Sequence, residues 1–471
     1  MKKILLFLVL ISFFACKNKV EKAPNTAVLK GIIENQLGDF ITISHKVGLE
    51  KITDTARVDS TGKFILKIDI KKPGYYTFFH GRETASLYLS PGDSINLKLN
   101  TDEFDETLSF DGKGALANNY IIETYLLNEK LGIDYREIYK LEKNNFISKI
   151  DSIYKILNKH LEEFIGKNED FNDYFISMEK NKLLYKKASL KIKYPESYKY
   201  MTKNDSLDLG EDYNDYLNEL NLNDSNLLEL PEFINFLISY MKEEVNKLFE
   251  EDTILAKKDN GYMLAMIKVI QNTFTDHKIK EYLLYNLMYE QLRYYGINNI
   301  DEIMKVFKEN CTKKEYLDKI EEEYKNWEVI AFGKKAPVFE YQDIEGNLVS
   351  LSDFIGKYVY IDIWATWCGP CIGELPYLEK LNKDFKNKNI VFMSVSVDKD
   401  KDAWKKMVIE KEMKGLQLFA DKAWESSIAV DYLVHSIPSF ILIDKEGNII
   451  NPKAKRPSAG IYEVIQKLEG L

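Results

Sequence analysis

Cysteine and histidine are scarce in this chain of 471 residues, which contains four cysteines and five histidines. Four cysteines are too few for a framework of structural disulfides. The histidines show no spacing typical of metal ligands, so we predict neither a metal site nor a cofactor. Basic blocks are also missing, and the formal net charge of −9 argues against nucleic acid as a partner. Hydrophobic residues make up 45% of the chain, which is enough for two or three packed domains.

Long apolar runs are confined to the start of the chain. Residues 4–15 contain a single polar residue, Ser12, and follow the pair Lys2-Lys3. A run of this length is shorter than the roughly 20 residues that a helix needs to cross a bilayer, and the pattern is typical of a signal peptide. We therefore predict that the protein is exported and that residues 1–15 are its signal peptide.

The residues around Cys16 indicate how the exported protein is held. Phe14-Ala15-Cys16 resembles a bacterial lipobox, in which the cysteine is lipidated and becomes the first residue of the mature protein. Phe13 stands where the lipobox usually has leucine, and an ordinary secretory signal with an incidental cysteine is the alternative. Residues 16–27 would form a short polar tether without an acidic tract after the cysteine. The resemblance implies a lipid-anchored protein of the cell envelope, and the missing acidic tract favours an orientation that faces the periplasm.

Residues 28–113 and 114–330 differ in the periodicity of their apolar residues. In the first segment, strand-like runs such as 64–68 and 95–99 are separated by turn residues, and about seven short strands predict a small β-sandwich or barrel. In the second segment, apolar residues recur at i+3 and i+4 steps and predict an α-helical domain. Neither segment carries recognisable chemistry. We interpret the helical one as a spacer, a shield or a docking surface for the last domain.

The most informative motif is Cys368-Gly369-Pro370-Cys371, which follows an apolar, strand-like run over residues 358–364. A strand that leads into Cys-x-x-Cys places the first cysteine at the start of a helix, where unpaired backbone N–H groups favour the thiolate over the thiol. Two cysteines one helical turn apart can close a disulfide and reopen it. The motif therefore predicts a dithiol–disulfide redox centre.

Residues 331–471 resemble a thioredoxin-fold domain of the TlpA/ResA-like, AhpC/TSA-related type, which occurs in membrane-tethered thiol–disulfide oxidoreductases. The β pattern ahead of it resembles a domain of unknown function that often precedes thioredoxin domains in Bacteroidetes-type lipoproteins. We therefore expect an N-terminal all-β sandwich-like domain, a central α-helical region and a C-terminal α/β thioredoxin fold. Besides Cys-x-x-Cys, the resemblance rests on segments that follow the family's order: Ala336-Pro337, Glu345-Gly346-Asn347, Leu351-Ser352-Asp353, Gly356-Lys357, residues 391–398, Ser436-Ile437-Pro438, residues 441–444 and Glu446-Gly447-Asn448.

The resemblance implies roles for two cysteines and two carboxylates. Cys368, at the helix start, is expected to attack the disulfide of a substrate, and Cys371 is expected to resolve the mixed disulfide. Asp362 stands where thioredoxins have a buried aspartate, whose raised pKa lets it take the proton of the resolving thiol. A capping residue at a strand end is the alternative for Asp362. Glu374 matches a glutamate near the active site of TlpA/ResA-like proteins, although an ordinary exposed helix glutamate fits the position as well.

The substrate-binding face is expected to contain a cis-proline and the residues around the motif. In the family, the proline that matches Pro438 is cis, which leaves the backbone of Ile437 free to pair with an extended substrate segment. Trp367 is expected to lie beside the disulfide. Gly369-Pro370 matches the dipeptide of reducing thioredoxins and so favours a reductant over an oxidant.

The leading hypothesis is a membrane-tethered envelope enzyme that reduces disulfides of exported proteins, such as cytochrome c apoproteins or misoxidised partners. The resemblance implies a transmembrane dithiol donor that supplies the electrons. A thiol peroxidase is a second hypothesis, but Ile361 and Ala365 stand where such enzymes have the proline and the Thr or Ser of the peroxide pocket. A third is a ligand- or partner-binding lipoprotein with an auxiliary redox domain. The remaining cysteine, Cys311, is interpreted as a partly buried free thiol.

Overall fold

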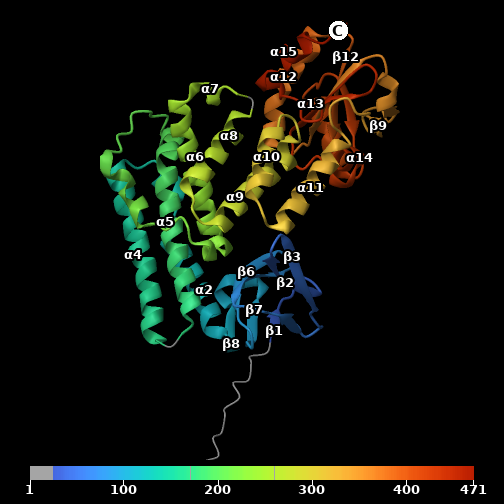
Figure 1. Cartoon of the computed structure of the whole chain (residues 1–471). Helices are drawn as coiled ribbons and strands as arrows, with labels where there is room; N and C mark the ends of the chain where they lie inside the picture. Colours follow the sequence, from blue (N-terminus) through green and yellow to red (C-terminus); the bar gives the residue numbers. More distant parts are fainter. Residues whose placement is uncertain (1–24, 170, 259) are drawn as a thin grey trace, which may run out of the picture. The chain divides into compact units, whose positions relative to one another are not determined.

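The chain forms two compact units, Met1–Asn214 and Asp215–Leu471 (Figure 1). The predicted signal peptide, Cys16 and most of the tether lie outside the described residues. No helix within the described part of the chain combines the length and the apolar character that crossing a membrane requires. The computed structural model describes residues 25–169, 171–258 and 260–471.

The first unit contains two four-stranded sheets that share one apolar core. Along β4, Phe64, Leu66 and Ile68 are buried and the residues between them are exposed, because successive side chains of a strand point to opposite faces. The strand orders are β4-β1-β7-β8 and β3-β2-β5-β6, with β1 parallel to β7. The strands are β1 (Thr26–Glu34), β2 (Phe40–Val47), β3 (Glu50–Arg57), β4 (Lys63–Asp69), β5 (Gly74–His80), β6 (Glu83–Leu89), β7 (Ser94–Asn100) and β8 (Ser109–Lys113).

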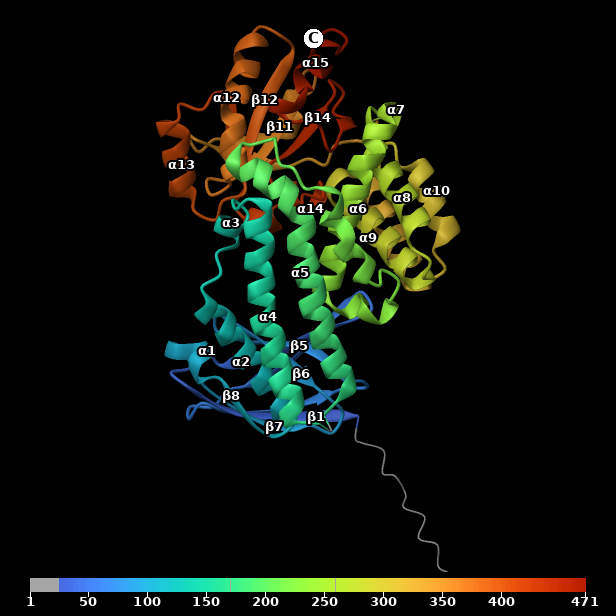
Figure 2. The ribbon, with the colours of Figure 1, turned by 90° about the vertical axis from the view of Figure 1, so that its left-hand side faces the viewer.

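Two long helices of this unit, α4 and α5, lie side by side (Figure 2). The ring of Phe146 on α4 stacks on that of Tyr194 on α5, with centroids 3.9 Å apart. Phe146, Ile150, Ile153 and Leu157 recur at i+3 and i+4 steps along α4, and all four are buried. The helices are α1 (Phe104–Thr107), α2 (Ala115–Leu131), α3 (Tyr135–Ile138), α4 (Lys143–Lys167) and α5 (Asp173–Thr202), with a 3-10 turn η1 (Thr101–Glu103) ahead of α1.

The second unit begins with helices and ends with an α/β domain. The 3-10 segment η2 (Glu211–Glu219) spans the division between the units, so the predicted helical segment 114–330 contributes helices to both of them. Pro231 is the first residue of α6, where its missing N–H leaves no helical bond unmade. The helices are η3 (Ser225–Glu229), α6 (Pro231–Glu251), α7 (Thr253–Ala256), α8 (Gly261–Thr273), α9 (His277–Tyr295), α10 (Asp301–Asn310) and α11 (Lys314–Glu328).

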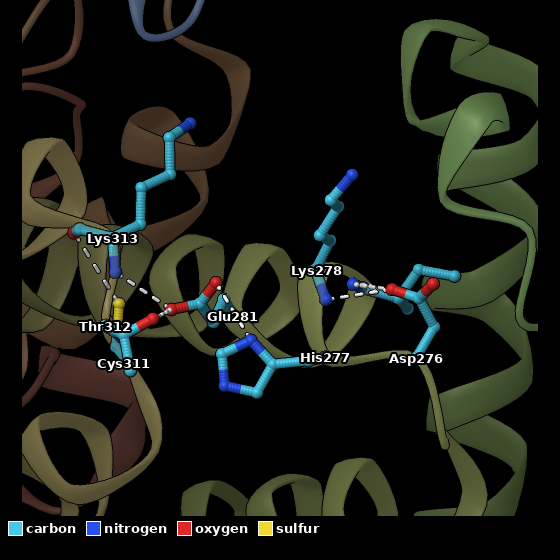
Figure 3. Close-up of polar contacts among 8 residues, drawn as sticks. Asp276, His277, Lys278, Glu281, Cys311, Thr312 and Lys313 are labelled. Carbon is cyan, nitrogen blue, oxygen red and sulfur yellow. Dashed lines mark hydrogen bonds and ion pairs between the residues drawn. The ribbon is translucent and has the colours of Figure 1, made fainter.

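Glu281 on α9 binds the segment between α10 and α11 (Figure 3). Its Oε1 accepts hydrogen bonds from the N–H of Thr312, from the hydroxyl of Thr312 at 2.9 Å and from the N–H of Lys313 at 2.9 Å. Burial alone would raise the pKa of Glu281, but these hydrogen bonds outweigh burial and lower it. The neighbouring Cys311 is 3% exposed, and burial, together with the charge of Glu281, raises the pKa of its thiol to about 11. Cys311 is thus a buried, protonated thiol at neutral pH.

The C-terminal domain is built on a seven-stranded sheet of order β10-β9-β13-β12-β11-β14-β15. Every residue of β11 and of β14 is buried, and β11 runs parallel to β12 and antiparallel to β14. On one face, Tyr360 stacks on Phe440 within an apolar cluster that includes residues of α12 and α15. The predicted fold class, with an N-terminal β domain, a helical region and a C-terminal thioredoxin fold, is confirmed.

The elements of this domain alternate between strands and helices. The strands are β9 (Glu340–Asp343), β10 (Leu348–Ser350), β11 (Tyr358–Trp364), β12 (Ile390–Ser396), β13 (Leu416–Phe419), β14 (Ser439–Ile443) and β15 (Ile449–Asn451). The helices and 3-10 turns are η4 (Leu351–Phe354), α12 (Gly369–Asp384), α13 (Lys401–Glu410), η5 (Ala423–Glu425), α14 (Ser427–Asp431), η6 (Pro457–Ala459) and α15 (Ile461–Gln466).

Candidate active site

Cys368 and Cys371 form a disulfide at the point where β11 ends and α12 begins. Cys368 is the N-cap of α12, and its Sγ accepts a hydrogen bond from the N–H of Cys371 at 3.2 Å. Gly369 and Pro370, between the cysteines, are exposed. Cys368 is 5% exposed and Cys371 is 3% exposed, so burial in the oxidised form does not distinguish the two sulfurs. That Cys368 attacks first stays a prediction, which the N–H groups at the helix start favour on electrostatic grounds.

Asp362 lies inside β11, two residues before the strand ends, and is 3% exposed. Its Oδ2 accepts a hydrogen bond from the hydroxyl of Ser394 on β12, at 3.3 Å. Burial, and to a lesser extent the charge of Glu374, raise the pKa of Asp362 to about 7, while the Ser394 hydrogen bond opposes this rise. A carboxyl group that titrates near neutral pH can act as a general base or acid for a thiol.

Glu374 lies one helical turn after Cys371 on α12 and is 5% exposed, so it is not an ordinary surface glutamate. Two donors come from Ser458 in η6. The N–H of Ser458 donates to Oε2 of Glu374 at 3.0 Å, and its hydroxyl donates to Oε1 at 2.8 Å. The structure therefore buries two carboxyl groups of the site, Asp362 on β11 and Glu374 on α12.

A third buried carboxylate, Asp398, holds the backbone just ahead of Cys368. Asp398 is 2% exposed, and it accepts hydrogen bonds from the N–H of Thr366 at 2.9 Å and from the hydroxyl of Thr366 at 2.7 Å. The hydroxyl of Ser396 donates to the same carboxylate at 2.7 Å. Sequence reasoning missed this contact, although a signal existed. Asp398 follows the strand after β11, and parallel neighbouring strands end at the same edge of a sheet.

The residues expected at the substrate-binding face are grouped at the same edge. The Ile437–Pro438 peptide bond is cis, and both residues are partly buried. They precede Ser439, which pairs with Ile363 near the end of β11. The sequence analysis did not single out Trp424 in η5, whose ring centroid lies 6.5 Å from that of Trp367.

The two indoles are both open to solvent, since Trp367 is 61% exposed and Trp424 is 38% exposed. Trp364, in contrast, is fully buried. Within the described ranges, His, Cys, Asp and Glu side chains nowhere gather in threes that could hold a metal ion. The arrangement is thus a disulfide at a helix start, three buried carboxyl groups and a pair of exposed indoles.

A disulfide at this position of an α/β sheet is expected of a thioredoxin-fold oxidoreductase, and comparisons with known proteins agree with this class. Residues 331–463 match the Redoxin family model. The thiol-disulfide oxidoreductase ResA of Bacillus thuringiensis subsp. konkukian is 34% identical over 142 residues, which cover 30% of this chain and 80% of the relative. ResA of Bacillus subtilis is 32% identical over 125 residues, which cover 26% of this chain and 67% of the relative.

Solved structures with similarity to the chain carry the same description. The thioredoxin domain of a thiol-disulfide oxidoreductase from Bacteroides vulgatus is 36% identical, with a TM-score of 0.28, and the match covers 29% of this chain and 96% of that one. A thiol-disulfide oxidoreductase from Bacteroides fragilis is 28% identical, with a TM-score of 0.27, and the match covers 29% of this chain and 100% of that one. From its similarity to the ResA proteins, the chain belongs to the ResA family of thiol–disulfide oxidoreductases.

The raised pKa of Asp362 predicts how its removal changes stability. The carboxyl group ionises near its ordinary value, 3.8, in the unfolded chain but only at about 7 in the folded protein, so ionisation opposes folding progressively as the pH rises between these values. We expect Asp362→Asn to raise the Tm of the oxidised protein at pH 8 and to leave it nearly unchanged at pH 4. Calorimetry across this pH range measures the difference.

Asp384→Asn, at the exposed end of α12, is the matched control and should show no such pH-dependent gain. An equal gain for Asp362→Asn at pH 4 and at pH 8 would contradict the prediction, because it would mean that ionisation is not the cause.

Proposed function

We propose that this chain is a lipid-tethered thiol–disulfide oxidoreductase of the cell envelope that reduces disulfides of exported proteins. The observation that carries the proposal is the Cys368–Cys371 disulfide at the start of α12, next to the exposed indole of Trp367. A dithiol in this position can exchange two electrons with another disulfide. The lipobox-like residues ahead of Cys16 support the tether, and the signal-like start of the chain supports export.

The reaction consists of two exchanges that balance in atoms and electrons. The thiolate of Cys368 attacks one sulfur of the client disulfide, which forms a mixed disulfide and releases the other client sulfur as a thiolate. Cys371 then loses its proton, with Asp362 as the proposed acceptor, and attacks the sulfur of Cys368. This step closes the Cys368–Cys371 disulfide and releases the second client thiolate. The client gains two electrons, and a transmembrane dithiol donor returns two electrons to the oxidised pair.

The first turn of α12 supports the reducing direction. Pro370 lies in this turn and has no backbone N–H, so the helix start offers one donor fewer to the thiolate of Cys368. A less stabilised thiolate makes the dithiol form a stronger reductant. Cytochrome c apoproteins, whose cysteines must be reduced before haem attachment, and misoxidised partners are the proposed clients.

The reduction potential of the Cys368–Cys371 pair tests the direction. We expect a value of about −270 mV or lower, as in reducing thioredoxins, because the helix start stabilises the thiolate only weakly. The measurement follows tryptophan fluorescence in a thiol redox buffer, with Trp367 next to the pair as the reporter. A potential near −120 mV, typical of a strong oxidant, would reverse the proposed direction. Trp367→Phe, which removes the reporter, is the control for the signal.

Trapping of clients tests the function itself. We expect Cys371→Ala, produced in the envelope, to accumulate mixed disulfides between Cys368 and exported proteins, because the resolving thiol is missing. The adducts should appear on non-reducing gels and vanish on reduction. The matched control is Cys368→Ala combined with Cys371→Ala, which keeps only the buried thiol of Cys311 in the described residues. Equal adducts in both variants, or none in Cys371→Ala, would contradict the proposal.

The exposed pair Trp367 and Trp424 is the proposed contact surface for the polypeptide on either side of the client disulfide. Large aromatic side chains that are exposed beside a reactive group are typical anchors for a protein partner. We expect Trp424→Ala to lower kcat/KM for reduction of insulin, a protein disulfide, about tenfold, which corresponds to about 1.4 kcal/mol. Reduction of hydroxyethyl disulfide, which is too small to reach both rings, should stay within a factor of two.

Leu348→Ala, an exposed apolar residue on the edge strand β10, is the matched control for the loss of apolar surface. If Trp424→Ala slowed both substrates equally, Trp424 would support the structure of the site and not the client.

A further inference from the structure

Lys453 lies two residues after the end of β15, and its ammonium group contacts two separate parts of the second unit. Its Nζ donates a hydrogen bond to Oγ of Ser439 at 3.3 Å, and it lies 5.5 Å from the centroid of the Trp327 ring on α11. The side chain is partly buried, and burial lowers the pKa of the ammonium group to about 8, so the group is still charged at neutral pH. A cation within about 6 Å of a tryptophan ring centroid is attracted to the ring, and the attraction strengthens where water is excluded.

Trp327 is held in place by the helices that precede the redox domain. Its side chain is fully buried. Gly296, directly after α9, allows this packing, because a Cβ atom at that position would lie 3.2 Å from Cε3 of the ring. Beyond α11, the N–H of Gly333 donates to the carbonyl of Ile449 at 2.8 Å, and the N–H of Ile449 donates to the carbonyl of Lys334 at 2.8 Å. These contacts fix the end of α11, and with it the ring, relative to β15.

A second contact joins the helices to the backbone of Lys453. Oδ1 of Asn451 accepts hydrogen bonds from Nδ2 of Asn298, in the turn between α9 and α10, at 3.1 Å and from the N–H of Lys453 at 2.8 Å. Asn298 and Trp327 both precede residue 331, where the match to the Redoxin family begins. Lys453 therefore belongs to the redox domain, but residues outside that domain contribute to its position.

Ser439, the other partner of the ammonium group, directly follows the cis peptide bond between Ile437 and Pro438. It is 6% exposed and is the first residue of β14, where its backbone pairs with Ile363 on β11. We call residues 434–438 the cis-proline loop. The loop thus ends at a residue whose backbone is held by the sheet and whose side chain is held by Lys453.

We propose that Lys453 is a positioning residue through which the helices α9–α11 hold the cis-proline loop in the conformation that binds a client segment. The inference rests on the proposed exchange with protein clients and on the expected pairing of an extended client with the backbone of Ile437. It is independent of the tether, the electron donor and the direction of electron flow. It gives the helical region ahead of the redox domain a part in client binding.

The contact should matter for polypeptide substrates and not for small disulfides. An extended client can pair with the loop only where the loop backbone keeps its direction, because this kind of docking uses main-chain hydrogen bonds. Loss of the ammonium group would separate Ser439 from the helices, so the loop could move relative to Cys368. A small disulfide reaches the sulfur of Cys368 without pairing with the loop.

Steady-state reduction by the full chain tests the proposal. We expect Lys453→Met, which keeps an apolar stem and removes the charge, to raise KM for insulin about fivefold, the loss expected of one cation–ring contact. The kcat for insulin and the rate with hydroxyethyl disulfide should stay within a factor of two. Lys453→Arg, which keeps a cation and a donor, should restore the wild-type KM. Lys455→Met, which removes an exposed lysine from the same segment, is the matched control.

Hydrogen exchange measured by mass spectrometry gives a readout that needs no substrate. In Lys453→Met, the amides of a peptide that covers residues 434–440 should exchange faster, whereas those of β11 should keep their protection. Equal loss of protection in β11 would overturn the proposal, because Lys453 would then support the whole domain and not the loop. Unchanged exchange in the loop would overturn it as well, whether or not the chain reduces insulin.

Two double-mutant cycles assign the effect to the two partners of the ammonium group. Trp327→Phe, whose ring attracts a cation less strongly, should raise KM for insulin, and Lys453→Met should add little in that background. The same is expected of Ser439→Ala, which removes the acceptor and changes the volume little, so the test stands even if Trp327→Phe does not fold. Fully additive effects of Lys453→Met and Ser439→Ala, or an equal rise in KM for Lys455→Met, would contradict the proposed role.

Discussion

The active site depends on the complete burial of strand β11. Every residue from Tyr358 to Trp364 is buried, because β12 and β14 flank the strand, and residues of α12 and α15 pack against one of its faces. A strand of this kind must be almost wholly apolar, and Asp362 is the one acidic residue in it. The same burial that gives β11 its stability keeps water from Asp362 and so brings its pKa close to neutral. The strand then ends where α12 begins, which places Cys368 at the helix start.

The sequence predicted the parts of the structure that depend on neighbours in the chain. The run before Cys368 has the composition of a buried strand, the Cys-x-x-Cys spacing fits one helical turn, and the helices of residues 114–330 show their periodicity openly. The alternation along β4 and β7 likewise predicted a two-sided β domain. These signals are local, since a strand or a helix shows one face to the core through the spacing of its own residues.

The contacts that sequence reasoning missed come from segments far along the chain. Ser458 lies 84 residues after Glu374, and Asp398 lies 32 residues after Thr366. Nothing in the sequence near Glu374 shows that η6 covers it, and its spacing on α12 alone fits an exposed residue equally well. Cys311 is similar, because its polar neighbours suggest partial exposure whereas Glu281 and the helices around it bury the thiol. Burial of a single polar side chain is a tertiary property.

We expect two carboxyl groups of the site to have different roles. Asp398 positions the chain ahead of Cys368, and Asp362 is the proposed proton acceptor. Asp398 accepts hydrogen bonds from the backbone N–H and the hydroxyl of Thr366, so it fixes the path of the chain into Cys368. Asp362 and Glu374 do not contact Thr366 in this way. Asp362 accepts a hydrogen bond from Ser394, and Glu374 accepts two from Ser458. A substitution at Asp398 would therefore disturb where the attacking sulfur stands, whereas one at Asp362 would remove the carboxyl group whose pKa lies near neutral. The domain thus offers separate carboxyl groups for the position of the sulfur, at Asp398, and for the proposed proton transfer, at Asp362.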